Sequence, residues 1–251
     1  MSENWASYMC IWDDLPASVL LNLALKADAP FRDRPVLGWL FIDMKHPQPD
    51  GLPSPEEFEA FGAIEDQIDK CLRAASALDA GRICGQGRWE RYFYIPTGLD
   101  FDGWASKTLK GFRDRVFQSG SRLDPDSRQY LEVLYPALVH MQQIRNQPVL
   151  MQLQQAGDLN ETPRLVDHFA YFPDEAGRNS FESWARSHDY DARALDRVET
   201  DRPWGTELRK VHGVDLATIC DVTLELSEEC QSRGGEYDGW ASPVVRTAEP
   251  P

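Results

Sequence analysis

The sequence predicts an α+β protein built from two domains, and three observations support this fold class. Segments with helical and with strand periodicity alternate along all 251 residues. A turn-rich stretch at residues 157–163 carries the Gly and Pro typical of a linker. Acidic charge concentrates beyond it, because residues 1–157 hold 16 Lys and Arg against 21 Asp and Glu, whereas residues 158–251 hold 10 against 20. We therefore expect domains over residues 1–157 and 158–251.

The first domain is expected to open with strands and a capped helix. Its first strand-like segments are rich in aromatic and apolar residues and cover residues 5–13, 19–26 and 36–44. Ser54 can cap a helix that begins at Pro55, and Glu57 can close a capping box. We expect this helix over residues 54–78, with an apolar face formed by Phe58, Phe61, Ile68, Leu72 and Ala75.

The rest of the first domain is expected to mix strands and helices. Strand character recurs at residues 81–86, 88–96 and 113–119, and a helix is expected at residues 99–111. Residues 124–157 have helical periodicity but contain Pro136 and Pro148, each of which lacks a backbone donor. We therefore expect a mixed α+β domain whose C-terminal part is a kinked or broken set of helices.

The second domain shows a regular succession of elements. Strand-like segments cover residues 165–172, 189–198, 206–213 and 236–245. Asp174 can cap a helix after the first of them, and Asp215 can cap another after the third. The resulting order, β-α-β-β-α-β, is that of a ferredoxin-like sandwich with two helices on one face of an antiparallel sheet.

The composition excludes several functional classes. The net charge of −15 and the pI of about 4.7 oppose direct binding of nucleic acid, because a field of that sign repels phosphates. The apolar run at residues 36–42 is far too short to span a bilayer, and the N-terminus lacks a basic and apolar leader. The five cysteines are scattered without metal-binding spacing. We expect a cytoplasmic protein with reduced thiols and no cofactor.

The sequence contains no phosphate-binding loop and no nucleophile elbow, so catalysis has weak support. Paired acids occur at Asp13-Asp14, at Asp100 and Asp102, and at Asp124 and Asp126. Asp100 and Asp102 could hold Mg²⁺ in a metal-dependent phosphodiesterase or nuclease, which we keep as the alternative function. The structural alternative is a turn at Asp13-Asp14 and helix caps at Asp100 and Asp124. We favour it, and expect no catalytic residue and no metal.

Two aromatic features invite a structural or a binding interpretation. His168 lies in a strand with Asp167 on the other face, so we expect a structural or surface histidine rather than a general base. The phrase Phe101-Asp-Gly-Trp-Ala-Ser106 is echoed by Tyr237-Asp-Gly-Trp-Ala-Ser242. Asp-Gly before Trp suggests a bulge or turn that redirects the ring, either into the core, which we favour, or towards a partner.

One helix of the second domain carries a row of acids. Asp221, Glu225 and Glu228 recur at i, i+4 and i+7, and Glu229 follows them. This row either keeps the protein soluble or steers a basic partner onto the domain. Our candidate partner-binding residues are Asp221, Glu225, Glu228, Glu229, Tyr237, Asp238 and Trp240.

The second domain resembles a known family. Residues 163–173, the helix of Phe181 and Trp184, the Leu216–Cys230 helix and the run Gly234-Gly-Glu-Tyr-Asp-Gly-Trp240 resemble the RraB family, regulators of ribonuclease E activity B. The resemblance covers about residues 158–246 and implies a ferredoxin-like domain that inhibits an endoribonuclease by binding it, without catalysis. It therefore implies a protein partner, for which an endoribonuclease of the ribonuclease E type is the candidate. From the charge and the short apolar runs we expect no direct nucleic-acid binding and no membrane partner.

The first domain resembles an uncharacterised bacterial family that is often joined to RraB-like domains. The resemblance lies in Leu134-Tyr-Pro136, Ile144-Arg-Asn146 and Gly157-Asp158. It implies no function for this domain.

Overall fold

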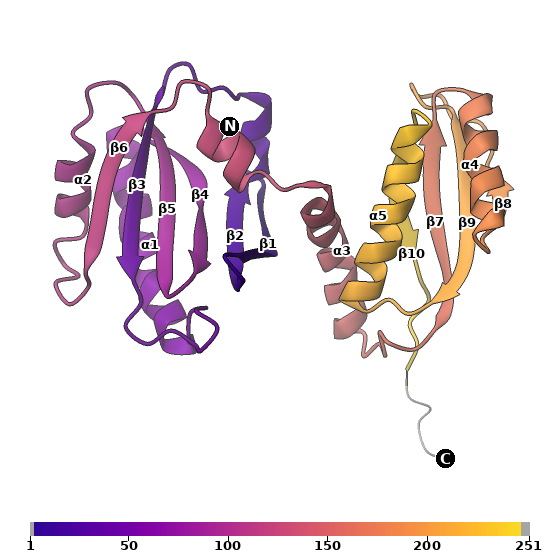
Figure 1. Ribbon diagram of the computed structural model, residues 1–251, viewed down its shortest axis with the longest axis horizontal. Coiled ribbons are helices and arrows are strands. Elements are labelled where there is room, and N and C mark those ends of the chain that lie inside the picture. The colour runs from indigo at the N-terminus through magenta and orange to yellow at the C-terminus, as the bar shows by residue number, and fades with distance from the viewer. Residues whose placement is uncertain (1–2, 247–251) are drawn as a thin grey trace, which may run out of the picture. The chain divides into compact units, whose positions relative to one another are not determined.

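The computed structural model of the protein describes residues 3–246 and contains two α+β bodies (Figure 1). The chain divides into two compact units, Met1–His140 and Met141–Pro251, each with its own antiparallel sheet. The expected α+β class with two domains is therefore confirmed. None of the helices in the described residues is long and apolar enough to cross a membrane.

The first unit is built on a sheet of six strands in the order β1-β2-β4-β5-β3-β6. These strands are β1 (Trp5–Trp12), β2 (Leu15–Asn22), β3 (Val36–Asp43), β4 (Leu78–Gly85), β5 (Arg88–Ile95) and β6 (Phe117–Leu123). Asp13 and Asp14 form the turn between β1 and β2 with positive φ angles of 48° and 66°, which agrees with the expected turn. The strand expected at residues 19–26 ends earlier, because Leu23–Ala27 forms a 3-10 turn (η1).

Two helices cover one face of this sheet. Helices α1 (Pro55–Ala75) and α2 (Phe101–Thr108) pack apolar side chains on it, among them Phe61, Ile64, Ile68, Phe101 and Ala105. Phe58 was expected on the buried face of α1, but its ring is 64% exposed. Ser54 caps α1 as expected, whereas the Glu57 carboxylate accepts hydrogen bonds from the backbone N–H groups of Lys45 and His46.

A short π-helical segment, η2 (Gln129–Leu134), belongs to the first unit and carries buried side chains. The buried Asp124 lies five residues before this segment rather than at its N-cap position, which is Arg128, and its carboxylate accepts from the backbone N–H groups of Arg128 and Gln129. The same carboxylate accepts from the Tyr94 hydroxyl at 2.7 Å, which fastens η2 to the sheet. The helical region breaks near Pro136, as expected, but continues through Pro148 as one helix, α3 (Leu138–Gln155).

Helix α3 packs with the second unit. Its Val149, Leu150 and Leu153 contact Val166 and Val214 in one apolar cluster. The compact units therefore divide at residues 140 and 141, ahead of the boundary expected near Gly157. That residues 158–251 fold on their own, without α3, stays a prediction.

The second unit contains β7 (Arg164–Phe172), α4 (Glu175–Ser187), β8 (Asp191–Ala194), β9 (Trp204–His212), α5 (Leu216–Ser232) and β10 (Glu236–Ala241). The strands lie in the order β10-β7-β9-β8, and every pair is antiparallel. Asp174 and Asp215 cap α4 and α5, as expected, by accepting from the N–H groups of Gly177 and Thr218. The strand expected over residues 189–198 shortens to four residues, Asp191–Ala194.

Candidate protein-binding site

The acidic row lies on α5. Asp221, Glu225 and Glu228 are exposed, and none of them forms an ion pair with the described residues. Glu229 is half-buried and pairs with Arg233, one turn further along the helix. The structure thus brings three of the four acids together as an unpaired stripe and directs the fourth to an intrahelical ion pair. We call Asp221, Glu225 and Glu228 the acidic stripe.

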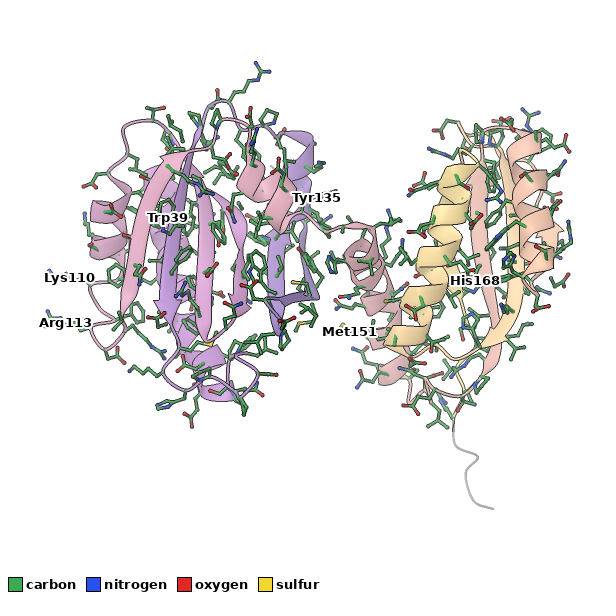
Figure 2. All side chains as sticks on the ribbon, viewed as in Figure 1. Trp39, Lys110, Arg113, Tyr135, Met151 and His168 are labelled. Atoms are coloured by element: carbon green, nitrogen blue, oxygen red, sulfur yellow. The ribbon has the colours of Figure 1, made fainter. Side chains whose placement is uncertain are left out.

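Tyr237, expected at a binding surface, is a core residue. It is only 6% exposed, and its hydroxyl lies 2.8 Å from Nδ1 of His168. His168 is fully buried on β7 (Figure 2), and its Nε2 lies 3.0 Å from Nε2 of His212 on β9. Three strands of the sheet are therefore linked through one row of side chains, and the ring of Tyr237 is not available to a partner.

The hydrogen bonds of this row fix which atoms carry protons. Nδ1 of His212 lies 2.6 Å from the carbonyl oxygen of Gly213, which only accepts, so His212 donates from Nδ1. Its neutral ring then accepts at Nε2 from the Nε2–H of His168, whose Nδ1 accepts from the Tyr237 hydroxyl. Burial lowers the pKa of His168 to about 3, and burial also lowers the pKa of His212. Both rings are thus neutral near pH 7, and the row is structural.

Asp238 and Trp240 differ from Tyr237 because their side chains are not buried, and all three residues line a groove. This groove has a volume of about 430 Å³ and lies between β10 and α3; its lining is Gln142, Arg145, Asn146, Val149, Glu236, Tyr237, Asp238, Gly239 and Trp240. Trp240 donates from Nε1 to Oδ1 of Asn146 at 2.9 Å. Asn146 in turn donates to the hydroxyl of Thr223 on α5 at 2.9 Å. The half-buried Trp240 therefore anchors one wall of the groove to the other.

The residues of α3 that line the groove were not among the expected site residues. The sequence pattern placed residues 138–155 in the first domain, so their contribution to the second was missed. The helical spacing of Gln142, Asn146 and Val149 indicates that they share one side of a helix, but it does not indicate which unit that side contacts. The partner strand, however, lies about ninety residues further along the chain, as the 94-residue separation of Asn146 and Trp240 illustrates.

The acids of the alternative metal site have structural roles. Asp100 caps α2, since its Oδ1 accepts from the N–H of Gly103 at 3.0 Å. Asp102 accepts from the Ser119 hydroxyl at 2.6 Å. No group of three or more His, Cys, Asp or Glu side chains within residues 3–246 is arranged to hold a metal ion. The interpretation of Asp100 as a helix cap agrees with the structure.

Two family models match the chain. The model described as "Family of unknown function (DUF695)" matches residues 3–135, and the model described as "Regulator of ribonuclease activity B" matches residues 143–242. The RraB resemblance is thereby confirmed, but it starts earlier than residue 158 and includes α3. Residues 144–146 and 157–158, expected to mark the first family, fall within the second match.

No curated protein matches the chain. Among the solved structures, the crystal structure of an unknown protein from Galdieria sulphuraria shares 11% identity with this chain. The similarity covers 82% of this chain and 98% of that one, with a TM-score of 0.22.

Proposed function

We propose that this protein, which belongs to the family of unknown function DUF695, is a regulatory protein without catalytic activity. The premise is that its residues 143–242 match the regulators of ribonuclease activity B. Its second unit binds an endoribonuclease of the ribonuclease E type and inhibits it. The match over residues 143–242 carries this proposal, because it includes most of α3 and every later element of the second unit up to β10.

The topology of the second unit supports the proposal. Numbered along the unit, its strands lie in the order fourth, first, third, second, and α4 and α5 share one face of the sheet. This order supports the ferredoxin-like sandwich that the RraB resemblance implies. The fold alone specifies no activity, so the function must be argued from its surface.

The charge of the second unit also supports a protein partner that is basic. Residues 141–251 hold 11 Lys and Arg against 20 Asp and Glu, a net charge of −9. Like charges at i and i+4 on a helix cost a few tenths of a kcal/mol per pair, so the acidic stripe does not stabilise α5. Such a stripe accelerates the encounter with a basic surface. A protein segment that binds RNA phosphates through Lys and Arg offers such a surface.

The proposal is tested by binding and by RNA cleavage. The ribonuclease E-type enzyme of the source organism is immobilised, and the association and dissociation rates of the full chain are measured at 0.05 and 0.3 M salt. Binding should slow RNA cleavage by the enzyme. Added salt should lower the association rate more than it raises the dissociation rate, because it screens the acidic stripe.

A matched pair of variants separates the stripe from net charge. Asp221→Asn with Glu225→Gln and Glu228→Gln should lower the association rate several-fold. The control neutralises Asp191, Asp196 and Glu199, which are also exposed, belong to residues 191–199 rather than to α5, and change the net charge by the same amount. If the chain does not bind the ribonuclease, the proposed function is wrong. If both triple variants slow association equally, the stripe contributes only net charge.

A further inference from the structure

The groove between β10 and α3 follows the free edge of a strand. Five consecutive residues, 236–240, line it. Consecutive side chains of a strand point to opposite faces of the sheet, so one cavity touches all five only if it runs along the edge, beside the backbone. β10 is the edge strand of its sheet, and β7 is its one strand neighbour. The groove therefore exposes backbone hydrogen-bonding groups.

The opposite wall of the groove is a single stripe of α3. Gln142, Arg145, Asn146 and Val149 follow the spacing i, i+3, i+4 and i+7, which places them on one side of the helix. Two of these side chains are already held in place, since Gln142 donates to the hydroxyl of Ser227 and Asn146 to that of Thr223. These two side chains are thus ordered before any partner arrives, which lowers the entropic cost of binding.

The strand wall is shaped by a β-bulge. The pairing of β10 with β7 shifts between Tyr237 and Gly239, so Asp238 has no residue opposite it on β7. In the described part of the chain, the backbone of β10 forms hydrogen bonds only within its sheet. The Asp238 side chain is exposed at this bulge and forms no ion pair with the described residues.

The two walls carry opposite charges that do not meet. Arg145 on α3 is exposed and has no ion pair among residues 3–246, whereas β10 contributes Asp238 and Glu236. Glu236 pairs with Arg202 at 3.0 Å, so Asp238 is the acid left for a ligand. A ligand that fits must therefore offer a cation to the strand wall and an acceptor to the helix wall, along an extended backbone.

We propose that this groove binds an extended peptide segment of the protein partner, which adds to β10 as a fifth strand between β10 and α3. The proposal rests on the proposed function, because it takes the partner to be a protein. Five residues of β10 span about 16 Å at roughly 3.3 Å per residue, enough to pair with four or five residues of the segment. Main-chain hydrogen bonds then supply affinity, and a Lys or Arg beside Asp238 supplies selectivity.

The groove is tested with peptides rather than with the ribonuclease. A random octapeptide library displayed on phage is selected on the full chain, and the dissociation constants of synthetic copies are measured by fluorescence polarisation. Selected peptides should carry a basic residue, and the amides of residues 236–240 should exchange more slowly with deuterium when a peptide is bound. Asp238→Pro removes one backbone donor at a position without a partner on β7, which should weaken binding about tenfold.

A second variant guards against misfolding of the first. Arg145→Glu reverses an exposed charge on α3 and should weaken the same peptides about threefold, whereas Arg113→Glu, an equally exposed arginine of the first unit, should leave them unchanged. Failure to select any peptide, or equal binding by wild type and both groove variants, overturns the groove proposal. The peptide assay does not involve the ribonuclease. The groove can therefore bind peptides even if the chain does not inhibit a ribonuclease, and the chain can inhibit a ribonuclease even if the groove binds no peptide.

Discussion

The run Asp-Gly-Trp-Ala-Ser occurs at residues 102–106 and again at 238–242, and its two copies adopt different secondary structures. The first copy lies in helix α2, where Trp104 packs on Phe93 and Phe101. The second lies mostly in strand β10, where Gly239 has a φ of 130° at the bulge and Trp240 reaches Asn146.

The flanking residues decide between the two conformations. Asp100 precedes the first copy and caps a helix, and Lys107 and Thr108 extend it. Gly234 and Gly235 precede the second copy, and Pro243 follows it, which disfavours helical backbone at Ser242. Five identical residues thus have no fixed secondary structure of their own. Substitutions in and beside the two copies test this comparison. The free energy of unfolding of each unit is measured from the deuterium exchange of its peptides.

Substitutions of the residues that precede the two copies, Phe101 and Tyr237, should differ most in their effect on the free energy of unfolding. Phe101 is 2% exposed between α2 and the sheet, so Phe101→Ala should destabilise the first unit by about 4 kcal/mol through the cavity it leaves. Tyr237→Phe keeps the ring in place and removes only the donor to His168, so it should destabilise the second unit by about 1 to 2 kcal/mol. Equal effects of the two substitutions would contradict this contrast.

The second-largest contrast should be in how the stability of each unit depends on pH. Of the two copies, only the second lies beside a buried histidine, His168. His168 has a folded-state pKa of about 3, below its unfolded value near 6.5, so the unfolded chain binds the proton first. Its contribution to stability is present above pH 6.5 and is lost as the pH falls towards 3. Between pH 6.5 and 4.5 the second unit should lose about 2 kcal/mol from this residue. A variant with His168→Gln should lose less over the same range; an unchanged pH dependence would refute the assignment.

The two glycines should respond differently to the same change. Gly239→Ala forces a side chain onto a backbone with φ of 130° and should cost the second unit about 1 to 2 kcal/mol. Gly103→Ala places a methyl group 2.2 Å from the Asp100 carboxylate and disturbs the cap, but alanine also favours a helix, so the net change should be near zero. The same destabilisation at both sites would show that the local backbone is not what separates the copies.

The acids beside the copies should show the smallest contrast. Asp100→Ala removes the cap of α2 and should cost about 1 kcal/mol. Asp238→Ala removes an exposed side chain from a bulge and should change the stability by less than about 0.5 kcal/mol. A larger loss at Asp238 would mean that its carboxylate stabilises the second unit, and its role in the groove would need revision.

Local chemistry predicted much of the fold. The caps at Ser54, Asp174 and Asp215, and the turn at Asp13-Asp14, are decided by neighbouring residues, and they appear where expected. The strand order of the first sheet could not be predicted in the same way. It places β3 between β5 and β6, a pairing that depends on contacts between residues far apart in the sequence.

The candidate site was predictable only in part. Helical spacing identified the acidic stripe, but the ion pair that removes Glu229 from it depends on the rotamers of one helical turn. Strand alternation put His168 and Asp167 on opposite faces and left open whether His168 is structural or at the surface. Its contact with His212 requires the register of β7 against β9. To predict the groove from the sequence, one would have to know both that α3 packs on the second unit and that β10 is an edge strand. Nothing local in residues 138–155 indicates which unit they join.

The packing of α3 has a consequence for how such chains recombine. A gene that joins the second unit to a different neighbour must carry the codons of α3, since Val149 and Leu153 fill the apolar cluster and Asn146 holds Trp240. A crossover at the Gly157 turn would separate the helix from the strand it faces. A crossover that keeps both units intact would fall between η2 and α3, around Pro136. The first family match ends there, at residue 135, and the second begins at residue 143. We therefore expect that genes which carry the second unit also encode α3, which precedes its first strand, β7.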